Sequence, residues 1–386
     1  MKRGIEMVIL NVKLDKILSF QNFDINFSYP VKLQKTLLDE EYLHYLPSFR
    51  YKKLNIFIGS NSSGKTSLMK AIWQILVFLN RKNINSLQNI IDYSYKESYI
   101  EIDLAEDNEN IHKLHKFKIK TINESNTKVL LAHNEINLTS ISSYEKEIKT
   151  LERMEYKFND YLEELNKIEF ISGWNIALPA TEDNFNKILF AEFNNDSDMK
   201  DYNYILSNVM KVLDPSISSV VQSKDATNAY VIEYFNGIRI IVQENMKLTS
   251  IPYLSSGTKY GFNIANMIYS IKHHLNGIYL IDEQFSYVNS DIEAALISTM
   301  ASLLGENEQL FITTHNSSIL SLGFPFHSFY FMKKEFINNK YLISVNCASE
   351  VENRNNVSPK TISDNDIFGS APKLDRIFKL GENFDE

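Results

Sequence analysis

Residues 59–66 read Gly59-Ser60-Asn61-Ser62-Ser63-Gly64-Lys65-Thr66, which is the G-x-x-x-x-G-K-[ST] spacing of a phosphate-binding loop. The apolar run at 54–58 just before it predicts a short buried strand. Apolar residues at helical spacing follow at 67–79 and predict a helix. Because phosphate binding by such a loop needs a strand before it and a helix after it, the combination favours a nucleotide-binding loop over a chance Gly/Ser turn.

The loop supplies several groups that suit a nucleotide phosphate. Its glycines tolerate positive φ, so the backbone can wrap around the anion and point its amides inward. We expect Lys65 to reach the β- and γ-phosphates of ATP and the Thr66 hydroxyl to bind Mg²⁺. The candidate ATP-binding residues of this segment are Gly59, Asn61, Ser62, Ser63, Gly64, Lys65, Thr66 and Ser67.

A second candidate segment lies at 278–283, where an apolar strand ends in two acids. Asp282 is the candidate Mg²⁺ ligand, and Glu283 is the candidate base that polarises the attacking water. Acids at strand ends are common in proteins. The preceding phosphate-binding loop is what favours the functional interpretation of this pair.

Composition limits the class of protein. A chain of 386 residues with 44% hydrophobic and 23% charged residues suits a globular protein of one large domain or two closely joined ones. The net charge of −8 argues against a general polyanion binder but leaves a local basic groove open. The single cysteine, Cys347, excludes an internal disulfide framework, and no apolar run approaches the roughly 20 residues of a membrane span. We therefore expect a cytoplasmic protein that does not bind membranes.

The rest of the chain alternates between predicted strands and predicted helices. A charged helix with an apolar stripe is predicted at 141–167, and helical structure is predicted at 183–214 with a break at 194–198. Asn236-Gly237 is a strong hairpin signal. Strands are predicted in two parts of 8–27 and at 98–104, 114–122, 127–131, 230–235, 239–243, 278–282 and 311–314.

Two features outside the nucleotide motifs also suggest surfaces for binding nucleic acid or a partner. A strand at 112–120 would place Lys116, Lys118 and Lys120 on one face, either lining a nucleic-acid groove or protecting an edge strand. The polar tail carries a small apolar cluster of Ile377, Phe378 and Leu380 that could dock on the core or on a partner.

Residues 254–258 read Leu-Ser-Ser-Gly-Thr. This run resembles the signature loop of ABC-type ATPases, in the Ser-Ser-Gly-Thr version of OLD-like ATPases. The resemblance implies that Ser255, Ser256 and Gly257 contact the γ-phosphate of ATP bound to the opposite protomer, as an anion-binding helix start can do. The alternative is an ordinary N-cap of the helix predicted at 259–275.

The strand at 311–314 leads into His315. This histidine resembles the switch histidine of the same family, which senses the γ-phosphate. A strand-end histidine in isolation is usually structural. Its position after the phosphate-binding loop, the signature and the Asp-Glu pair favours the functional interpretation.

The family resemblance implies an α/β fold: an ABC-type P-loop NTPase core with a mixed sheet flanked by helices and an inserted helical subdomain. We expect four parts. These are an N-terminal lobe at 1–140, a helical insertion at 141–228, a C-terminal lobe at 229–335 and an extension at 336–386. The chain looks like the compact OLD-like ATPases of anti-phage systems such as PARIS, Septu and retron-linked modules. The residues after His315 lack the pattern of a Toprim nuclease.

The resemblance implies a head-to-tail homodimer that binds and slowly hydrolyses ATP with Mg²⁺. It also implies a separately encoded effector protein, a nuclease or toxin, that the ATPase controls in antiviral defence. Two alternatives remain open from the sequence. One is a RecF-like or SMC-like DNA repair ATPase that clamps DNA, and the other is a non-catalytic scaffold locked by ATP.

Overall fold

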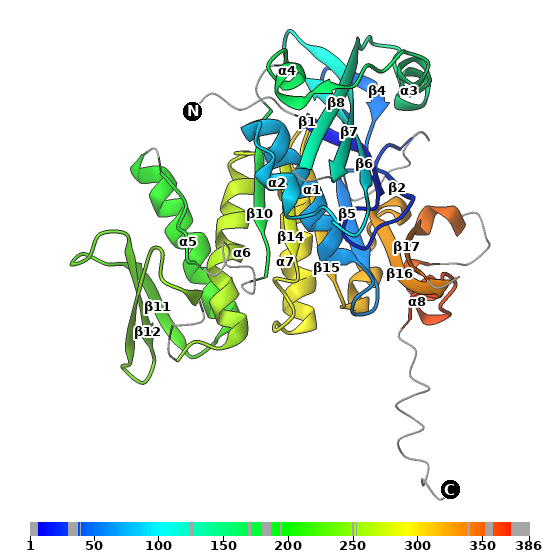
Figure 1. The fold of residues 1–386 in the computed structure, drawn as a ribbon. Coiled ribbons are helices and arrows are strands. Elements are labelled where there is room, and N and C mark those ends of the chain that lie inside the picture. Colours follow the sequence, from blue (N-terminus) through cyan, green and yellow to red (C-terminus); the bar gives the residue numbers. More distant parts are fainter. Residues whose placement is uncertain are drawn as a thin grey trace, which may run out of the picture.

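The computed structural model describes residues 7–29, 38, 40–123, 127–168, 171–179, 187–193, 195–248, 251, 253–337, 340–351 and 358–371. Two six-stranded sheets form the centre of the molecule, one mostly parallel and one antiparallel (Figure 1). A three-stranded sheet with two long helices lies to one side of the parallel sheet (Figure 1). This arrangement confirms the predicted mixed α/β class.

The parallel sheet carries the predicted nucleotide motifs. Its order is β10-β14-β15-β5-β16-β17, and all neighbours are parallel except β16 and β17. Its strands are β5 (Leu54–Ile58), β10 (Trp174–Ala177), β14 (Ile278–Asp282), β15 (Gln309–Thr314), β16 (Phe329–Ile337) and β17 (Lys340–Cys347). Every residue of β5, β14 and β15 is buried, as expected for central strands covered on both faces. Because these strands run parallel, their carboxyl ends lie at the same edge of the sheet, where the candidate site lies.

The antiparallel sheet has the order β2-β1-β6-β7-β8-β9. Its strands are β1 (Met7–Asp15), β2 (Phe23–Asn26), β6 (Glu97–Asp107), β7 (His112–Asn123), β8 (Thr127–Asn137) and β9 (Asn159–Asp160). The predicted strands at 98–104, 114–122 and 127–131 are confirmed and are longer than expected. A short ladder of β3 (Tyr42–Leu43) and β4 (Leu46–Arg50) stands apart from both large sheets.

Helix α1 (Lys65–Arg81) joins the two sheets into one core. Its buried face includes Leu68 and Ile72, which belong to one hydrophobic cluster with Phe117 of β7 and Leu280 of β14. The helix begins directly at Lys65, so the core holds the end of the phosphate-binding loop in place. The other helices are α2 (Asn85–Gln88), α3 (Tyr144–Glu152), α4 (Tyr161–Leu165), α5 (Asp196–Leu213), α6 (Ser256–Lys272), α7 (Ser290–Leu303) and α8 (Pro359–Asp364).

The three-stranded sheet consists of β11 (Ile217–Gln222), β12 (Ala229–Tyr234) and β13 (Arg239–Gln243). Its buried residues belong to a second large hydrophobic cluster, which also includes residues of β5, β14 and β15 of the parallel sheet. The predicted Asn236-Gly237 hairpin connects β12 to β13, with Gly237 at φ 84°. Helices α5 and α6 pack against each other beside this sheet (Figure 1). The predicted boundary at 228/229 falls inside this sheet, and the division into four parts stays a prediction.

The single charged helix predicted at 141–167 is wrong. The chain instead forms α3, the short strand β9 paired with β8, and α4. The reason is packing: Tyr144 and Leu151 of α3 enter a cluster with β1 and β6, whereas Leu165 of α4 enters the cluster around α1. One straight helix cannot deliver its apolar stripe to two different cores.

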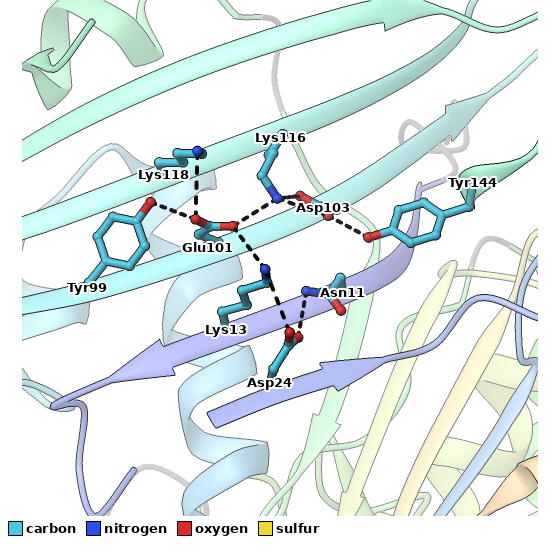
Figure 2. Close-up of polar contacts among 9 residues, drawn as sticks. All are labelled: Asn11, Lys13, Asp24, Tyr99, Glu101, Asp103, Lys116, Lys118 and Tyr144. Carbon is cyan, nitrogen blue, oxygen red and sulfur yellow. Dashed lines mark hydrogen bonds and ion pairs between the residues drawn. The ribbon is translucent and has the colours of Figure 1, made fainter. Parts of the chain in front are cut away.

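The lysine-rich strand predicted at 112–120 is neither an edge strand nor the wall of a nucleic-acid groove. Strand β7 lies between β6 and β8, so it is not an edge. Lys116 is only 1% exposed and its Nζ lies 2.9 Å from Glu101 Oε2 and 3.1 Å from Asp103 Oδ1 (Figure 2). Tyr144 Oη donates to Asp103 Oδ2 at 2.7 Å, and Lys118 lies 3.8 Å from Glu101. Acids of β6 thus neutralise the lysines of this face, which argues against a nucleic-acid groove there.

None of the described helices is long and apolar enough to cross a bilayer. In the C-terminal part, α8 contacts the 3-10 helix at Ser317–Ser321, which follows His315. The apolar cluster of Ile377, Phe378 and Leu380 lies outside the described residues.

Candidate nucleotide site

The loop at 59–66 connects β5 to α1, as predicted. Two of its glycines have no room for a side chain: a Cβ on Gly59 would lie 2.3 Å from the Met332 carbonyl oxygen, and one on Gly64 would lie 2.7 Å from Ile343 Cδ1. Gly64 also has φ 101°, which favours glycine. The close fit of the loop against β16 and β17 therefore requires glycine at both positions of the motif.

Lys65 folds back over its own loop. Its Nζ donates to the carbonyl oxygens of Gly59 at 2.9 Å and Ser60 at 3.1 Å, and the residue is 3% exposed. Burial lowers the pKa of Lys65 to about 8, although the charges of Glu283 and Asp282 act in the opposite direction. A buried ammonium held only by carbonyls can exchange them for phosphate oxygens, which would compensate its charge better.

Asp282 ends β14 next to the loop and is fully buried. Thr66 Oγ1 donates to its Oδ1 at 3.3 Å, and Thr313 Oγ1 also donates to Oδ1. Oδ2 is buried without a hydrogen-bond partner among the described residues. Burial raises the pKa of Asp282 to about 6. An unsatisfied carboxylate oxygen beside a threonine hydroxyl fits Mg²⁺, which prefers oxygen ligands.

Glu283 and His315 form a pair at the same edge. His315 Nε2 lies 3.3 Å from Glu283 Oε1, and the two side chains are 37% and 33% exposed. The hydrogen bond from His315 lowers the pKa of Glu283, so the carboxylate is ionised at neutral pH. Glu283 has φ 49° and its backbone N–H donates to Thr313 Oγ1 at 3.0 Å. The strained backbone aims an ionised acceptor at the space beside the loop.

These side chains line three cavities at the strand ends. A cavity of about 220 Å³ touches the loop from Ser62 to Ser67 together with Glu283. A larger one of about 570 Å³ touches Gly59, Asn61 and His315, and a third of about 240 Å³ lies between Glu283 and Asn316. The structure thus brings together the predicted loop, Asp282, Glu283 and His315 within one chain.

Three residues of this site were missed by sequence reasoning. Thr313 binds both Asp282 and the Glu283 backbone, and Ser19 and Lys334 line the cavity beside Lys65. Thr313 stands two residues before His315, so its position on the same strand was an available signal. Ser19 and Lys334 come from segments far from the motifs in sequence, and nothing local marks them.

The signature segment is not part of the same hollow. Ser255 caps α6, because its Oγ accepts the Thr258 N–H at 3.1 Å, and Ser255 and Ser256 are exposed. A Cβ on Gly257 would lie 2.7 Å from the Tyr287 carbonyl oxygen. Among the described residues that line the three cavities, none comes from 255–257. The N-cap interpretation describes the single chain correctly, and the γ-phosphate role stays a prediction.

Solved structures share this architecture. The Smc head domain with an extended coiled coil bound to the C-terminal domain of ScpA, from Pyrococcus furiosus, is 11% identical with a TM-score of 0.50. The alignment covers 89% of this chain and 98% of that one. The SMC head domain from Thermotoga maritima is 13% identical with a TM-score of 0.40, covering 87% and 97%. The likeness to the Pyrococcus furiosus structure concerns the fold alone, which is that of SMC heads and ABC-type P-loop ATPases.

No curated protein matches the sequence. A family model described as "AAA domain, putative AbiEii toxin, Type IV TA system" matches residues 54–321, which is well over half of the chain. The matched segment begins with β5 and includes the phosphate-binding loop, the signature segment, Asp282, Glu283 and His315. The chain therefore belongs to this AAA-domain family of P-loop ATPases.

Proposed function

We propose that the chain binds ATP with Mg²⁺ and hydrolyses it at a site that a second copy of the chain completes. One observation carries the proposal most: the buried, unsatisfied Oδ2 of Asp282 lies beside Thr66 and Lys65, where a cation bridging to phosphates would satisfy it. Mg²⁺ bound there would neutralise charge on the β- and γ-phosphates.

The chain's own residues have separate roles in this reaction. The loop amides and Lys65 hold the phosphates, and Thr66 with Asp282 supplies oxygen ligands. Glu283 is ionised and accepts a hydrogen bond from a water aligned with the γ-phosphate, while His315 holds the carboxylate in place. An ionised Glu283 favours catalysis over a purely structural role for ATP.

The signature segment supports the two-copy arrangement. Ser255 and Ser256 are exposed at the start of the 17-residue helix α6, and the cavities beside the loop are lined by other residues. In a symmetric dimer this helix start would face the γ-phosphate held by the other copy and complete two equal sites.

A mixing experiment tests this arrangement. Ser255→Arg should block the site in trans, and Lys65→Ala should empty the site in cis. A mixed dimer then has one site with both defects and one with neither, so mixing should restore part of the ATPase activity that each variant lacks. If heterodimers form and no activity returns, the composite site is wrong.

We further propose that the chain controls a separately encoded toxin or nuclease. The family description names a putative toxin of a Type IV TA system, so it supports a role in such a system and names no separate effector. Co-expression with the products of neighbouring genes, followed by purification with and without ATP, tests it. A partner that stays bound only to the Glu283→Gln variant in ATP would support control by the nucleotide state. Absence of any partner in both states would contradict it.

Clamping of DNA has less support, because the lysines of β7 pair with acids of β6 and β8. DNA affinity measured with and without ATP at two salt concentrations separates the alternatives. A strong, ATP-dependent affinity that falls steeply with salt would replace the effector proposal.

A further inference from the structure

A second cluster of ligand-type side chains lies on the antiparallel sheet, away from the nucleotide motifs. His115 of β7 is paired with Glu135 of β8, and His133 is paired with Phe117 two residues along each strand. Because residues two apart share a face, His115, His133 and Glu135 project from the same side of the sheet. One ligand atom from each lies within 4.8 Å of the other two.

Two of the three distances among these atoms match a metal coordination sphere, and the third lies within 4.8 Å. His115 Nδ1 lies 3.2 Å from His133 Nε2 and 3.3 Å from Glu135 Oε2. Four ligands at about 2.0–2.2 Å from a tetrahedral zinc ion stand roughly 3.3–3.5 Å from one another. Two imidazoles and one carboxylate are also a donor set that zinc accepts while keeping a fourth position for water.

The surrounding residues orient each candidate ligand. His115 Nε2 lies 3.4 Å from Glu106 Oε2, and Asn108 Nδ2 donates to the other oxygen of Glu106 at 3.1 Å. A hydrogen on Nε2 directed at Glu106 leaves the Nδ1 lone pair facing His133 and Glu135. Such a carboxylate behind a histidine is the usual outer partner of a metal ligand.

The other two side chains are held in a similar way. Lys113 Nζ lies 2.5 Å from Glu135 Oε1, which leaves Oε2 directed at His115. The ring of Phe117 stacks on His133 with centroids 4.5 Å apart. His115 is buried, His133 is partly buried and Glu135 is exposed, so an ion can enter from the Glu135 side.

We propose that His115, His133 and Glu135 form a binding site for a zinc-type divalent cation, with water as the fourth ligand. The ion would tie β7 to β8 and stabilise the antiparallel sheet. It would act independently of ATP, because all its ligands lie outside the nucleotide site. The alternative is a metal-free chain of hydrogen bonds from Glu106 through His115 to Glu135, in which His115 Nδ1 carries a proton.

The test measures Zn²⁺ binding to the full chain by calorimetry and Co²⁺ binding by visible absorption, without nucleotide. Millimolar Mg²⁺ is present throughout, because it occupies oxygen-rich sites such as Asp282 but competes poorly for imidazoles. We expect one Zn²⁺ per chain, a tetrahedral Co²⁺ spectrum and a melting temperature raised by a few degrees in excess Zn²⁺.

Two variants and one control make the result specific. His133→Gln should abolish the Co²⁺ spectrum, and Glu135→Gln, which is exposed and keeps its shape, should weaken Zn²⁺ binding at least about tenfold. His112→Gln removes a histidine from the same strand that pairs with Asp107 instead, and should bind Zn²⁺ like the wild type. The proposal is overturned if the wild type binds no Zn²⁺, or if the Glu135 and His133 variants bind it as tightly as the wild type.

Discussion

Two clusters of buried charge, each containing a lysine and two acids, differ in what satisfies them. On the antiparallel sheet, Lys116 contacts Glu101 and Asp103 directly (Figure 2). At the edge of the parallel sheet, Lys65 donates hydrogen bonds to the carbonyl oxygens of its own loop, and Asp282 Oδ2 has no hydrogen-bond partner among the described residues. The first cluster is complete within the chain, whereas we expect a ligand to complete the second. Unsatisfied buried charge is thus the better pointer to function.

The lysine pKa values reflect this contrast. Burial alone would lower the pKa of Lys116, but the charges of Asp103 and Glu101 raise it above its usual value. Burial lowers the pKa of Lys65 to about 8, and the acids nearby do not compensate. Lys116 therefore contributes to folding, whereas Lys65 is held ready for an anion at some cost in stability.

The largest expected effect is on the incomplete cluster. Lys65→Ala should weaken ATP binding by about 100-fold or more, because it removes the charge that faces the β- and γ-phosphates. Titration with a fluorescent ATP analogue measures the loss. Lys70→Ala, on the same helix but outside the loop, is the matched control and should bind like the wild type. Micromolar binding that persists in Lys65→Ala would place the phosphates elsewhere.

Glu283→Gln should keep ATP binding and lose about 100-fold or more in hydrolysis, because the amide has the shape of the carboxylate without its basicity. Phosphate release under saturating ATP measures the effect. Glu306→Gln, the same change at an exposed acid that pairs with His44 outside the site, serves as the control. A turnover rate unchanged in Glu283→Gln would move the base to another residue.

Substitutions in the cluster of Lys116, Glu101 and Asp103 should change the stability of the protein and not its affinity for ATP. Lys116→Met leaves Asp103 buried without its cation, while Glu101 keeps only longer contacts to Lys13 and Lys118, and we expect a cost of about 3–5 kcal/mol in the free energy of unfolding. Urea denaturation measures it. Lys120→Met breaks an exposed pair with Glu97 and should cost less than about 1 kcal/mol. Equal losses in the two variants would show that the buried network has no special weight.

Removing the charge of Asp282 should stabilise the protein, whereas removing that of Lys116 destabilises it. Its folded pKa of about 6 lies above the usual value of 3.8, so protonation favours the ligand-free fold. The contribution of protonated Asp282 to the free energy of unfolding is fully present below about pH 4 and is lost as the pH rises through 6. Asp282→Asn should therefore stabilise the ligand-free protein by about 3 kcal/mol at pH 7.5 while weakening Mg²⁺-dependent ATP binding. Thermal melts at pH 5 and pH 7.5 measure the first effect, and a destabilised variant at pH 7.5 would contradict it.

The motif-bearing elements were predictable from sequence because their signals are local. The strand at 54–58, the loop and the following helix lie next to one another in the chain, as do the strand at 278–282 and its acids. The roles of Lys334 and Ser19 were not predictable, because β16 and the turn after β1 reach the loop only through the folded sheets.

Two errors have the same physical origin. The stripe at 141–167 looked helical because its apolar residues recur at helical spacing, yet two different cores bury them. The lysines of β7 looked like surface residues because the acids that pair with them lie on β6, at least 13 residues earlier in the chain. In both cases the deciding partner is distant in sequence, which composition and periodicity do not show.

The central claim is tested most directly by the shift in melting temperature on adding MgATP. Wild type and Lys116→Met should gain the same stabilisation, about 2.7 kcal/mol at 100 times the dissociation constant, although Lys116→Met melts lower in both states. Lys65→Ala should gain at most about 0.4 kcal/mol, because a 100-fold weaker affinity brings this ATP concentration down to its dissociation constant. A wild type that MgATP does not stabilise, or a Lys65→Ala variant stabilised as much as the wild type, would contradict the assignment of the incomplete cluster as the ATP site.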